Sequence, residues 1–466
     1  LRSSITMILL TLVAILFCQS SGHLAGNLAS TPVQNTPTDN VAKSVKSLAN
    51  IEDYVSSAAF NLTEDGLLDF KGLAKKHIQP AEEYDVVTED GYIIKLFRVK
   101  GRSSKVVLVS HGILDSSDTF LLRGKTSLIY MLVKEGYDVW AINYRGNRYS
   151  RRHQTLNPDI NPLFWEYSMQ EFGCYDLAAS IDFILGQTGQ QQLSTFHCIV
   201  GHSEGSAAGF VLTSERPEYN SKISIFVATA PACYVSNCGT GGRTIFELGS
   251  VSGDIITAFG INELLGFDSL TQKLLTLVCS KGEAGYSACM RGLFSSLSGY
   301  GPENIEVEFF KTILGHWPAG TSRKNFLHYV QLGNSGEFAR YNYGSLNKVD
   351  ATKAPAYDLS KVTCKVALIG ARNDELVSVK DVGILEKQLP NVVFSYFENY
   401  DKFTHFDFTW GRNAHTYANY YVMFDNNEKK LNANVHGTCC KSYVVKLLST
   451  KRGPIDKQNI DNLLEN

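Results

Sequence analysis

The stretch from Ile199 to Gly205, which reads IVGHSEG, constrains the fold of this chain more than any other. An apolar run ends there in the pattern G-x-S-x-G, and small residues that suit a closely packed helix follow it. A sharp turn from a strand into a helix would lift Ser203 above the edge of a sheet, and Gly201 and Gly205 would let neighbouring backbone pass close by. The pattern also occurs by chance, so the surrounding chain must decide its meaning.

Short apolar runs alternate with helix-like stretches along most of the chain. This alternation favours a mostly parallel central sheet with helices on both faces, because parallel strands need crossover connections and are buried on both sides. Reactive groups in such sheets lie at the carboxyl ends of strands, where Ser203 is found. We therefore predict an α/β-hydrolase fold with an inserted cap. The predicted strands are Val106–Val109, Asp138–Tyr144, Phe196–Val200, Ile223–Ala228, Val366–Ile369 and Val392–Phe397, and the predicted helices include Thr126–Lys134 and Tyr175–Leu185.

An antiparallel hairpin is predicted before the first of these strands. Apolar and polar residues alternate over Glu83–Val99, on both sides of the dipeptide Asp90-Gly91. That dipeptide suits a tight turn in which φ is positive. Ordered structure is expected to begin near Asn61, where apolar residues first show a helical spacing.

The alternation stops after Pro231 and resumes near Val366. The residues between them do not fit the sheet, so we predict that they form a cap inserted over its edge. Two cysteines in this region, Cys279 and Cys289, could close a small loop. The predicted organisation is a first part of the core at 61–231, a cap and lid at 232–360, and a second part of the core at 361–424.

The N-terminus has the pattern of a secretory signal peptide. A charged start is followed by the apolar run Ile5–Phe17 and then by small and polar residues. A membrane anchor needs about 18 or more apolar residues, so we expect no stable membrane span after removal of the signal. This predicts a secreted protein or one of the lysosomal lumen. Residues 1–22 are assigned to the signal peptide, 23–60 to a flexible linker rich in Ser, Thr, Pro and Asn, and 425–466 to a C-terminal extension.

Two further features accompany export. Without Cys18, nine cysteines remain, and an odd number predicts at least one thiol that is free or pairs with another chain. The sequon Asn61-Leu62-Thr63 makes Asn61 a candidate for glycosylation.

A net charge of −2 offers no electrostatic footprint for nucleic acid, so polyanion binding is a poor hypothesis.

Catalysis by Ser203 requires a base, and in this fold the base follows the acid in the chain. Three histidines lie far enough along: His405, His415 and His436. His405 is the best placed, since it follows the predicted strand Val392–Phe397 across a short loop. His415 lies in a helix-like segment and His436 in a polar tail, so both are weaker candidates.

The acid that orients the base should also follow a strand. Asp374 comes directly after Val366–Ile369, with Glu375 and Asp381 as its competitors. An Asp in such a place is commonly a helix cap. The order Ser203, Asp374, His405 is what favours a catalytic triad.

Attack on an ester produces an oxyanion that needs two preorganised donors. One is predicted to be the backbone N–H of Glu204, the residue after the nucleophile. The other is predicted to be the N–H of Ile113, in the loop after Val106–Val109, where Gly112 allows close backbone approach. His111 precedes the nucleophile, which favours a role in shaping this loop over a role as base. No metal ion or cofactor is needed for this chemistry.

Most of the chain, from about Asn61 to about Val422, resembles the acid lipase family, which includes gastric and lysosomal acid lipases. Several of the matching blocks are long and distinctive, unlike G-x-S-x-G alone. They are EEYDVVTEDGYII (82–94), HGILDSS (111–117), GNRYSRRH (146–153), FWEYS (164–168), YDLAASIDFI (175–184), GHSEG (201–205), PAGTSRKNFLHYVQL (318–332), FARYNYGS (338–345), PAYDLS (355–360), ND (373–374) and HFDF (405–408).

The resemblance implies a capped α/β-hydrolase with the triad and oxyanion donors named above, acting without a metal on triacylglycerols or cholesteryl esters at a lipid–water interface. It also implies that Cys279 and Cys289 are bonded, since their placement is similar to that of the cap disulfide of the family. The chain departs from the family at Glu204, where vertebrate members usually carry Gln. Cys233 and Cys238 have no recognised counterpart and suggest an extra loop, and the tail with Cys439 and Cys440 lies outside the resemblance.

The favoured hypothesis is therefore a lipid carboxylic ester hydrolase that works through an acyl-serine intermediate. One alternative is a lipid-binding protein on the same scaffold without catalysis, although such a protein has no need for a complete triad. Another is a hydrolase of small esters or thioesters. The sequence does not distinguish acyl-chain length, alcohol preference or working pH.

Overall fold

The computed structural model describes residues 60–189, 196–258, 260–344 and 353–417. The predicted signal peptide, the predicted linker up to residue 59, His436, Cys439, Cys440 and the predicted C-terminal extension lie outside the described residues.

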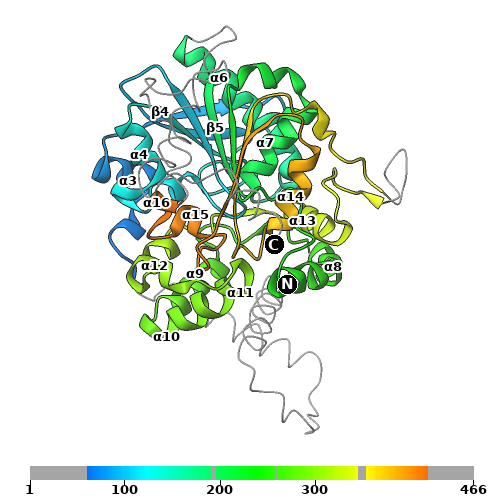
Figure 1. Cartoon of the computed structure of the whole chain (residues 1–466). Coiled ribbons are helices and arrows are strands. Elements are labelled where there is room, and N and C mark those ends of the chain that lie inside the picture. The colour runs from blue at the N-terminus through cyan, green and yellow to red at the C-terminus, as the bar shows by residue number, and fades with distance from the viewer. Residues whose placement is uncertain (1–59, 190–195, 259, 345–352, 418–466) are drawn as a thin grey trace, which may run out of the picture.

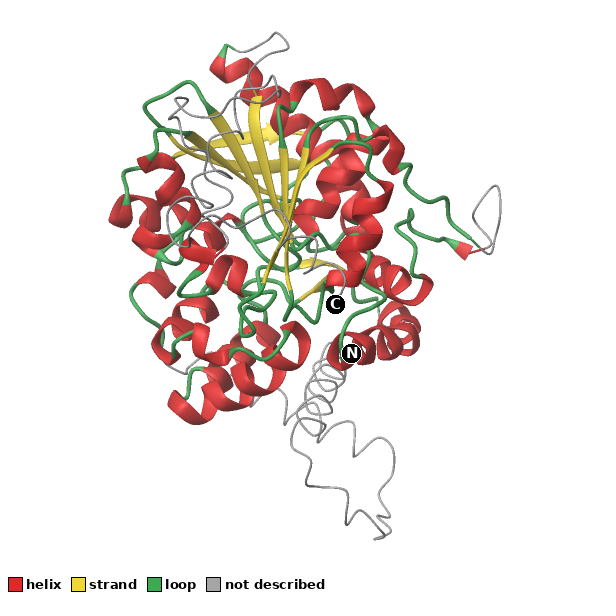
Figure 2. Cartoon of the chain, in the orientation of Figure 1, coloured by secondary structure: helices red, strands yellow, loops and turns green. Residues whose placement is uncertain are grey.

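An eight-stranded sheet crosses the molecule, and helices cover both of its faces (Figures 1 and 2). Its strand order is β1-β2-β4-β3-β5-β6-β9-β10. The strands from β4 to β10 run parallel, whereas β1 and β2 form an antiparallel edge. This confirms the predicted α/β-hydrolase fold. The strands are β1 (Glu82–Val87), β2 (Ile93–Val99), β3 (Val106–Ser110), β4 (Asp138–Asn143), β5 (Phe196–His202), β6 (Phe226–Thr229), β9 (Val366–Ala371) and β10 (Val392–Glu398).

Alternate side chains of the central strands enter two separate hydrophobic cores. In β3, Val106 and Leu108 belong to one core, and Val107 and Val109 belong to the other. All four are buried, because successive residues of a strand point to opposite faces and each face carries helices. The faces of the sheet are therefore filled by packing, and its carboxyl edge is left for polar groups.

The predicted hairpin is present as β1 and β2, which pair from Glu82 opposite Arg98 to Val87 opposite Ile93. Gly91 in the turn has φ of +92°, which glycine adopts without steric cost. The Thr88 hydroxyl supports the turn by donating to an Asp90 carboxylate oxygen at 2.6 Å.

Several boundaries differ from the predictions. The helix predicted at Thr126–Lys134 begins at Leu128, after a 3-10 helix at Gly124–Thr126. Helical structure begins before the predicted Tyr175–Leu185, with a short α-helix whose N-terminus carries a capping box of Ser168 and Glu171. A π-helical turn follows this short helix. The strand predicted from Ile223 begins at Phe226, a few residues after a 3-10 helix at Pro217–Lys222. The helices are α3 (Phe70–His77), α4 (Leu128–Lys134), α5 (Met169–Glu171), η5 (Phe172–Leu177), α6 (Ala178–Thr188), α7 (Glu204–Glu215), α14 (Val379–Gln388), α15 (Asp407–Trp410) and α16 (Ala414–Tyr417).

The described residues between β6 and β9 add no strand to this sheet. They are mainly helical, and α9 to α12 gather below the sheet in the view of Figure 1. A two-stranded pair that the sequence did not predict, β7 (Glu263–Leu264) with β8 (Thr321–Ser322), lies among them. The helices are α8 (Thr240–Ala258), α9 (Leu270–Cys279), α10 (Gly282–Tyr286), η7 (Ser287–Phe294), α11 (Ser295–Ser298), η8 (Pro302–Asn304), α12 (Val307–Leu314) and α13 (Arg323–Ser335).

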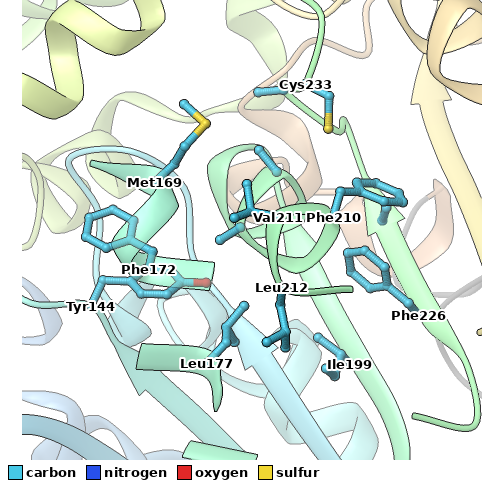
Figure 3. Close-up of a cluster of buried hydrophobic side chains, with 14 of the residues drawn as sticks. Tyr144, Met169, Phe172, Leu177, Ile199, Phe210, Val211, Leu212, Phe226 and Cys233 are labelled. Atoms are coloured by element: carbon cyan, nitrogen blue, oxygen red, sulfur yellow. The ribbon is translucent and has the colours of Figure 1, made fainter. Parts of the chain in front are cut away.

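Helix α7, which follows the predicted elbow, is buried from Glu204 to Ser214. Figure 3 shows Phe210, Val211 and Leu212 of this helix among the side chains of one hydrophobic core. Phe210 packs on Phe226 of β6 with ring centroids 4.8 Å apart. This close contact ties the helix that begins at the elbow to the sheet.

Replacing Gly209 of α7 by Ala should destabilise the protein. Alanine is the better helix former by about 1 kcal/mol, but here its Cβ would lie 2.4 Å from Cζ of the Phe226 ring. We expect a net loss of about 1–3 kcal/mol, seen as a lower thermal midpoint. The matched control is Gly186→Ala in α6, whose Cβ would meet no heavy atom within 4 Å and should keep or raise the midpoint. Equal midpoints for the two variants would contradict this packing.

Candidate active site

Ser203 lies in the sharp turn between β5 and α7, where the sequence predicted an elbow. Its φ of 54° belongs to a region that residues other than glycine rarely adopt. A Cβ at Gly201 would lie 2.6 Å from the amide nitrogen of Ser206, and one at Gly205 would lie 2.3 Å from the carbonyl oxygen of Ser110. Glycine is therefore required at both positions that flank the serine.

The structure brings Ser203, Asp374 and His405 together. Nε2 of His405 lies 2.9 Å from Oγ of Ser203, and its Nδ1 lies 2.8 Å from Oδ2 of Asp374. The three residues are 4%, 3% and 2% exposed, so water competes little for these hydrogen bonds. They come from the loops after β5, β9 and β10; β9 and β10 are neighbours in the sheet, and β6 lies between β5 and β9.

The second oxygen of Asp374 is held by backbone. Oδ1 accepts hydrogen bonds from the amides of Leu376 at 2.9 Å and Val377 at 2.8 Å. Asp374 thus caps the turn after β9 with one oxygen and holds His405 with the other. The capping role that competed with catalysis in the sequence is compatible with it here.

The other candidate acids and bases occupy different environments. Asp381 lies in α14 and accepts a hydrogen bond from the side chain of Asn237 at 2.7 Å. The side chain of Glu375 is exposed, and His415 lies in α16 without a hydrogen bond to the triad in the described part of the chain. Neither Glu375 nor Asp381 contacts His405 by a hydrogen bond among these residues.

His111 shapes the loop that follows β3. Its Nδ1 lies 2.8 Å from the carbonyl oxygen of Gly112, and its Nε2 accepts a hydrogen bond from the Tyr144 amide at 3.2 Å. Burial lowers the pKa of His111 to about 4, so the ring is neutral over most of the pH range. A loop-shaping role fits these contacts.

The loop that carries Ile113 approaches the serine, and Glu204 follows it in the chain. Gly112 lies so near that a Cβ there would be 3.3 Å from Cβ of Ser203. The next amide, that of Ile113, makes no hydrogen bond within the part of the chain that the structure describes. Glu204 is the first residue of α7, where the amide has no partner within the helix. The arrangement suits two donors near Oγ, and their role remains a proposal.

Comparison with known proteins shows the family to which the chain belongs. A model described as "Partial alpha/beta-hydrolase lipase region" matches residues 70–124, and one described as "alpha/beta hydrolase fold" matches residues 105–240. Lipase 1 of Drosophila melanogaster is 35% identical over 354 residues, which are 75% of this chain and 77% of that protein. The chain belongs to the acid lipase family.

Two mammalian members of the acid lipase family are equally similar. Gastric triacylglycerol lipase of Mus musculus is 35% identical over 348 residues, covering 72% of this chain and 85% of that protein. Lysosomal acid lipase/cholesteryl ester hydrolase of Homo sapiens is 35% identical over 349 residues, covering 72% and 84%. The similarity therefore extends well beyond the serine motif.

The sequence did not single out a neighbour of the triad, His202, or the partner of Glu204, Asn325. The ring of His202 lies beside that of His405, with centroids 5.1 Å apart. Burial, and next the proximity of His405, hold the pKa of His202 well below its usual range, so His202 stays neutral. Asn325 of α13 bonds to Glu204, and its place in the block PAGTSRKNFLHYVQL was the available signal for it.

The side chain of Glu204, where the chain departs from the acid lipase pattern, is buried beneath the elbow. Its Oε1 accepts a hydrogen bond from Nδ2 of Asn325 at 2.7 Å, and burial raises its pKa to about 8. Burial also raises the pKa values of Tyr144 and Tyr329, and the carboxyl of Glu204 adds to both shifts. No cationic side chain compensates this carboxyl in the described part of the chain.

Glu204 should therefore make the protein less stable as pH rises. Its pKa is raised in the folded state relative to an ordinary value near 4.5, so the folded protein binds the proton more tightly than the unfolded chain. Stability is unaffected below about pH 4.5, falls by up to about 1.4 kcal/mol per pH unit above it, and levels off above about pH 8.

The substitution Glu204→Gln, which restores the residue usual in vertebrate members, tests this dependence. We expect similar thermal midpoints for the variant and the parent protein at pH 4.5, and a higher midpoint for the variant at pH 8.5. The control is Glu135→Gln at an exposed position, which should shift the midpoint little at either pH. A difference between Glu204→Gln and parent that does not change with pH would exclude a buried titrating carboxyl.

The cysteines follow the predictions in one pair and depart from them in another. Cys279 and Cys289 form a disulfide. Cys233 and Cys238 are free thiols, so the suggested extra loop is wrong. Cys233 is fully buried among apolar side chains, where its thiol packs as a small apolar group and forms no disulfide (Figure 3).

The side chain of Asn61 is exposed, as a glycosylation site must be, although its modification remains a prediction.

Proposed function

We propose that this protein hydrolyses carboxylic esters of lipids through an acyl-serine intermediate. The observation that carries the proposal is the continuous hydrogen-bonded chain from Ser203 Oγ through the imidazole of His405 to Asp374. A hydroxyl is a weak nucleophile at its usual pKa, and an adjacent base held in one tautomer by a carboxylate makes it reactive.

In the proposed mechanism, Oγ of Ser203 attacks the ester carbonyl while Nε2 of His405 takes its proton. The amides of Ile113 and Glu204 stabilise the oxyanion, and Asp374 stabilises the imidazolium. Collapse breaks the bond to the alcohol, which leaves with the proton from His405. Water then attacks the acyl-serine with His405 as base, releasing the fatty acid and restoring Ser203. No metal ion or cofactor takes part in these steps.

The proposed substrates are triacylglycerols or sterol esters at a lipid–water interface. The names of the two mammalian relatives support both classes, since one is a triacylglycerol lipase and the other a lysosomal acid lipase/cholesteryl ester hydrolase. We propose that residues 232–360 form a cap over the site. We also propose that the protein acts outside the cell or in the lysosomal lumen. None of the described helices is long and apolar enough to cross a bilayer.

Replacing Ser203 by Ala should abolish ester hydrolysis while leaving the fold intact. Loss of a triad serine lowers kcat by several orders of magnitude, roughly 10⁴-fold or more, because no nucleophile remains. The measurement is fatty-acid release from an emulsified triacylglycerol, with the thermal midpoint as a check of folding. Ser206→Ala is the control, since Ser206 is a buried serine of the same helix and should leave turnover near the parent level. Turnover retained by Ser203→Ala would refute the proposal.

Asp374→Asn tests whether the catalytic acid is Asp374 or the adjacent Glu375. The amide cannot hold His405 in the tautomer that accepts the serine proton, so kcat should fall by about 10³–10⁴-fold. Glu375→Gln changes the adjacent, exposed carboxylate and should leave kcat close to that of the parent protein. The reverse result would assign the acid to Glu375.

The substrate class is decided by comparing three esters: an emulsified triacylglycerol, a cholesteryl ester and a short soluble ester. We expect turnover of one or both lipids. Turnover of the short ester alone would favour a small-ester hydrolase. A folded protein whose Ser203 takes no fluorophosphonate label would instead favour a lipid-binding protein.

A further inference from the structure

We propose that residues Ser298–Asn304, which we name the bridging segment, position the acid and the base of the triad relative to each other. This inference rests on the proposed catalytic function. The bridging segment runs from the last residue of α11 through η8, within residues 232–360, whereas Asp374 and His405 lie in loops after β9 and β10. Its role would be that of a positioning element, since the described contacts reach the triad loops and not the reacting atoms.

One carbonyl group joins the two loops. The oxygen of Ser298 accepts hydrogen bonds from the amide of His405 at 3.2 Å and from the amide of Glu375, next to Asp374, at 3.3 Å. The same carbonyl oxygen therefore holds the backbone of the base, His405, and the backbone of Glu375, the residue after the acid. The Ser298 hydroxyl donates back to the carbonyl of Phe294 at 2.9 Å, which holds Ser298 on its helix.

The bridging segment approaches both loops more closely than a side chain would allow. A Cβ at Gly299 would lie 1.9 Å from the carbonyl oxygen of Asn373, and one at Gly301 would lie 2.0 Å from the carbonyl oxygen of Lys402. Gly299 also has φ of 106° and ψ of 156°, a conformation that is essentially restricted to glycine. Asn373 donates a side-chain hydrogen bond to the carbonyl of Tyr300 at 3.1 Å, so the contact is held from both sides.

The far end of the bridging segment fixes the turn that carries His405. Nδ2 of Asn304, which is 4% exposed, donates to the carbonyl of Lys402 at 2.6 Å and to Oδ2 of Asp407 at 3.0 Å. The same oxygen of Asp407 accepts from the amide of Thr404 at 2.6 Å. Residues on both sides of His405 are therefore bonded to one asparagine.

These contacts should make kcat depend on the bridging segment, because the segment holds the two loops that carry the acid and the base. The triad needs hydrogen bonds of 2.8 and 2.9 Å at the two nitrogens of one ring, and a displacement of about 1 Å can reduce a rate by about 10²-fold. Changing the bridging segment should lower kcat and leave KM near the parent value, because the lipid-binding surface is not altered.

Two substitutions test the proposal on the full chain. Asn304→Ala removes both side-chain hydrogen bonds, and Gly299→Ala forces Asn373 away. The control is Gly383→Ala in α14, whose Cβ would meet nothing within 4 Å. For each folded variant, active sites are counted by complete titration with a fluorophosphonate, and kcat is expressed per titrated site on a short soluble ester. We expect kcat to fall about tenfold or more in the first two variants, with KM within about twofold of the parent, and to stay unchanged in Gly383→Ala.

The outcomes separate this proposal from the proposed function. A parent protein that takes no label at Ser203 and turns over no ester refutes the proposed function itself. An active parent with unchanged kcat per site in folded Asn304→Ala overturns the positioning role alone. If Gly299→Ala does not fold, Asn304→Ala decides. A loss confined to the number of titratable sites, with kcat per site preserved, shows a purely structural role and also overturns the proposal.

Discussion

The whole molecule depends on the burial of both faces of its parallel sheet. Neighbouring residues such as Val107 and Leu108 of β3 enter different hydrophobic cores, so no face is free for polar chemistry. The catalytic side chains lie at the edge where the parallel strands end. Ser203, Asp374 and His405, which are far apart in the sequence, meet there because β5, β9 and β10 all point to that edge. The geometry of the site is thus a consequence of packing.

The sequence predicted those parts of the site that depend on chain order and strand ends. Strand patterns and the fixed order of nucleophile, acid and base located Asp374 and His405, and the structure places them within hydrogen-bond distance of each other. Helix boundaries were less predictable, since the π-helical turn at Phe172–Leu177 leaves no periodic signal of its own. Backbone acceptors such as Ser298 O were out of reach, because any residue type supplies a carbonyl. The pairing of Asn325 with Glu204 joins residues 121 positions apart and needed the fold.

Two buried ionisable side chains, Arg145 and Glu204, differ in whether a side chain of opposite charge lies beside them. Arg145 is 1% exposed and is surrounded by carboxylates, with Asp176 at 2.6 Å and Asp90 at 2.9 Å from its guanidinium. Glu204 is equally buried, and within the described residues its carboxyl accepts a hydrogen bond only from the side-chain amide of Asn325. A buried charge with partners stays charged, whereas a buried carboxyl without a cation keeps its proton. The elbow thus lies above a carboxyl that keeps its proton up to about pH 8, whereas Arg145 is charged and paired.

The bonds around Ser298 also limit how the helical region between β6 and β9 can move. The carbonyl of Ser298 accepts from one amide in each of two core loops, and Gly299 and Gly301 lie against backbone oxygens of the same loops. If that region swung away as one rigid body, it would break these bonds and leave the histidine loop without support. If this region is the proposed cap, an opening that admits a lipid would hinge outside Ser298–Asn304, so that the bridging segment keeps its bonds while other parts of the cap move.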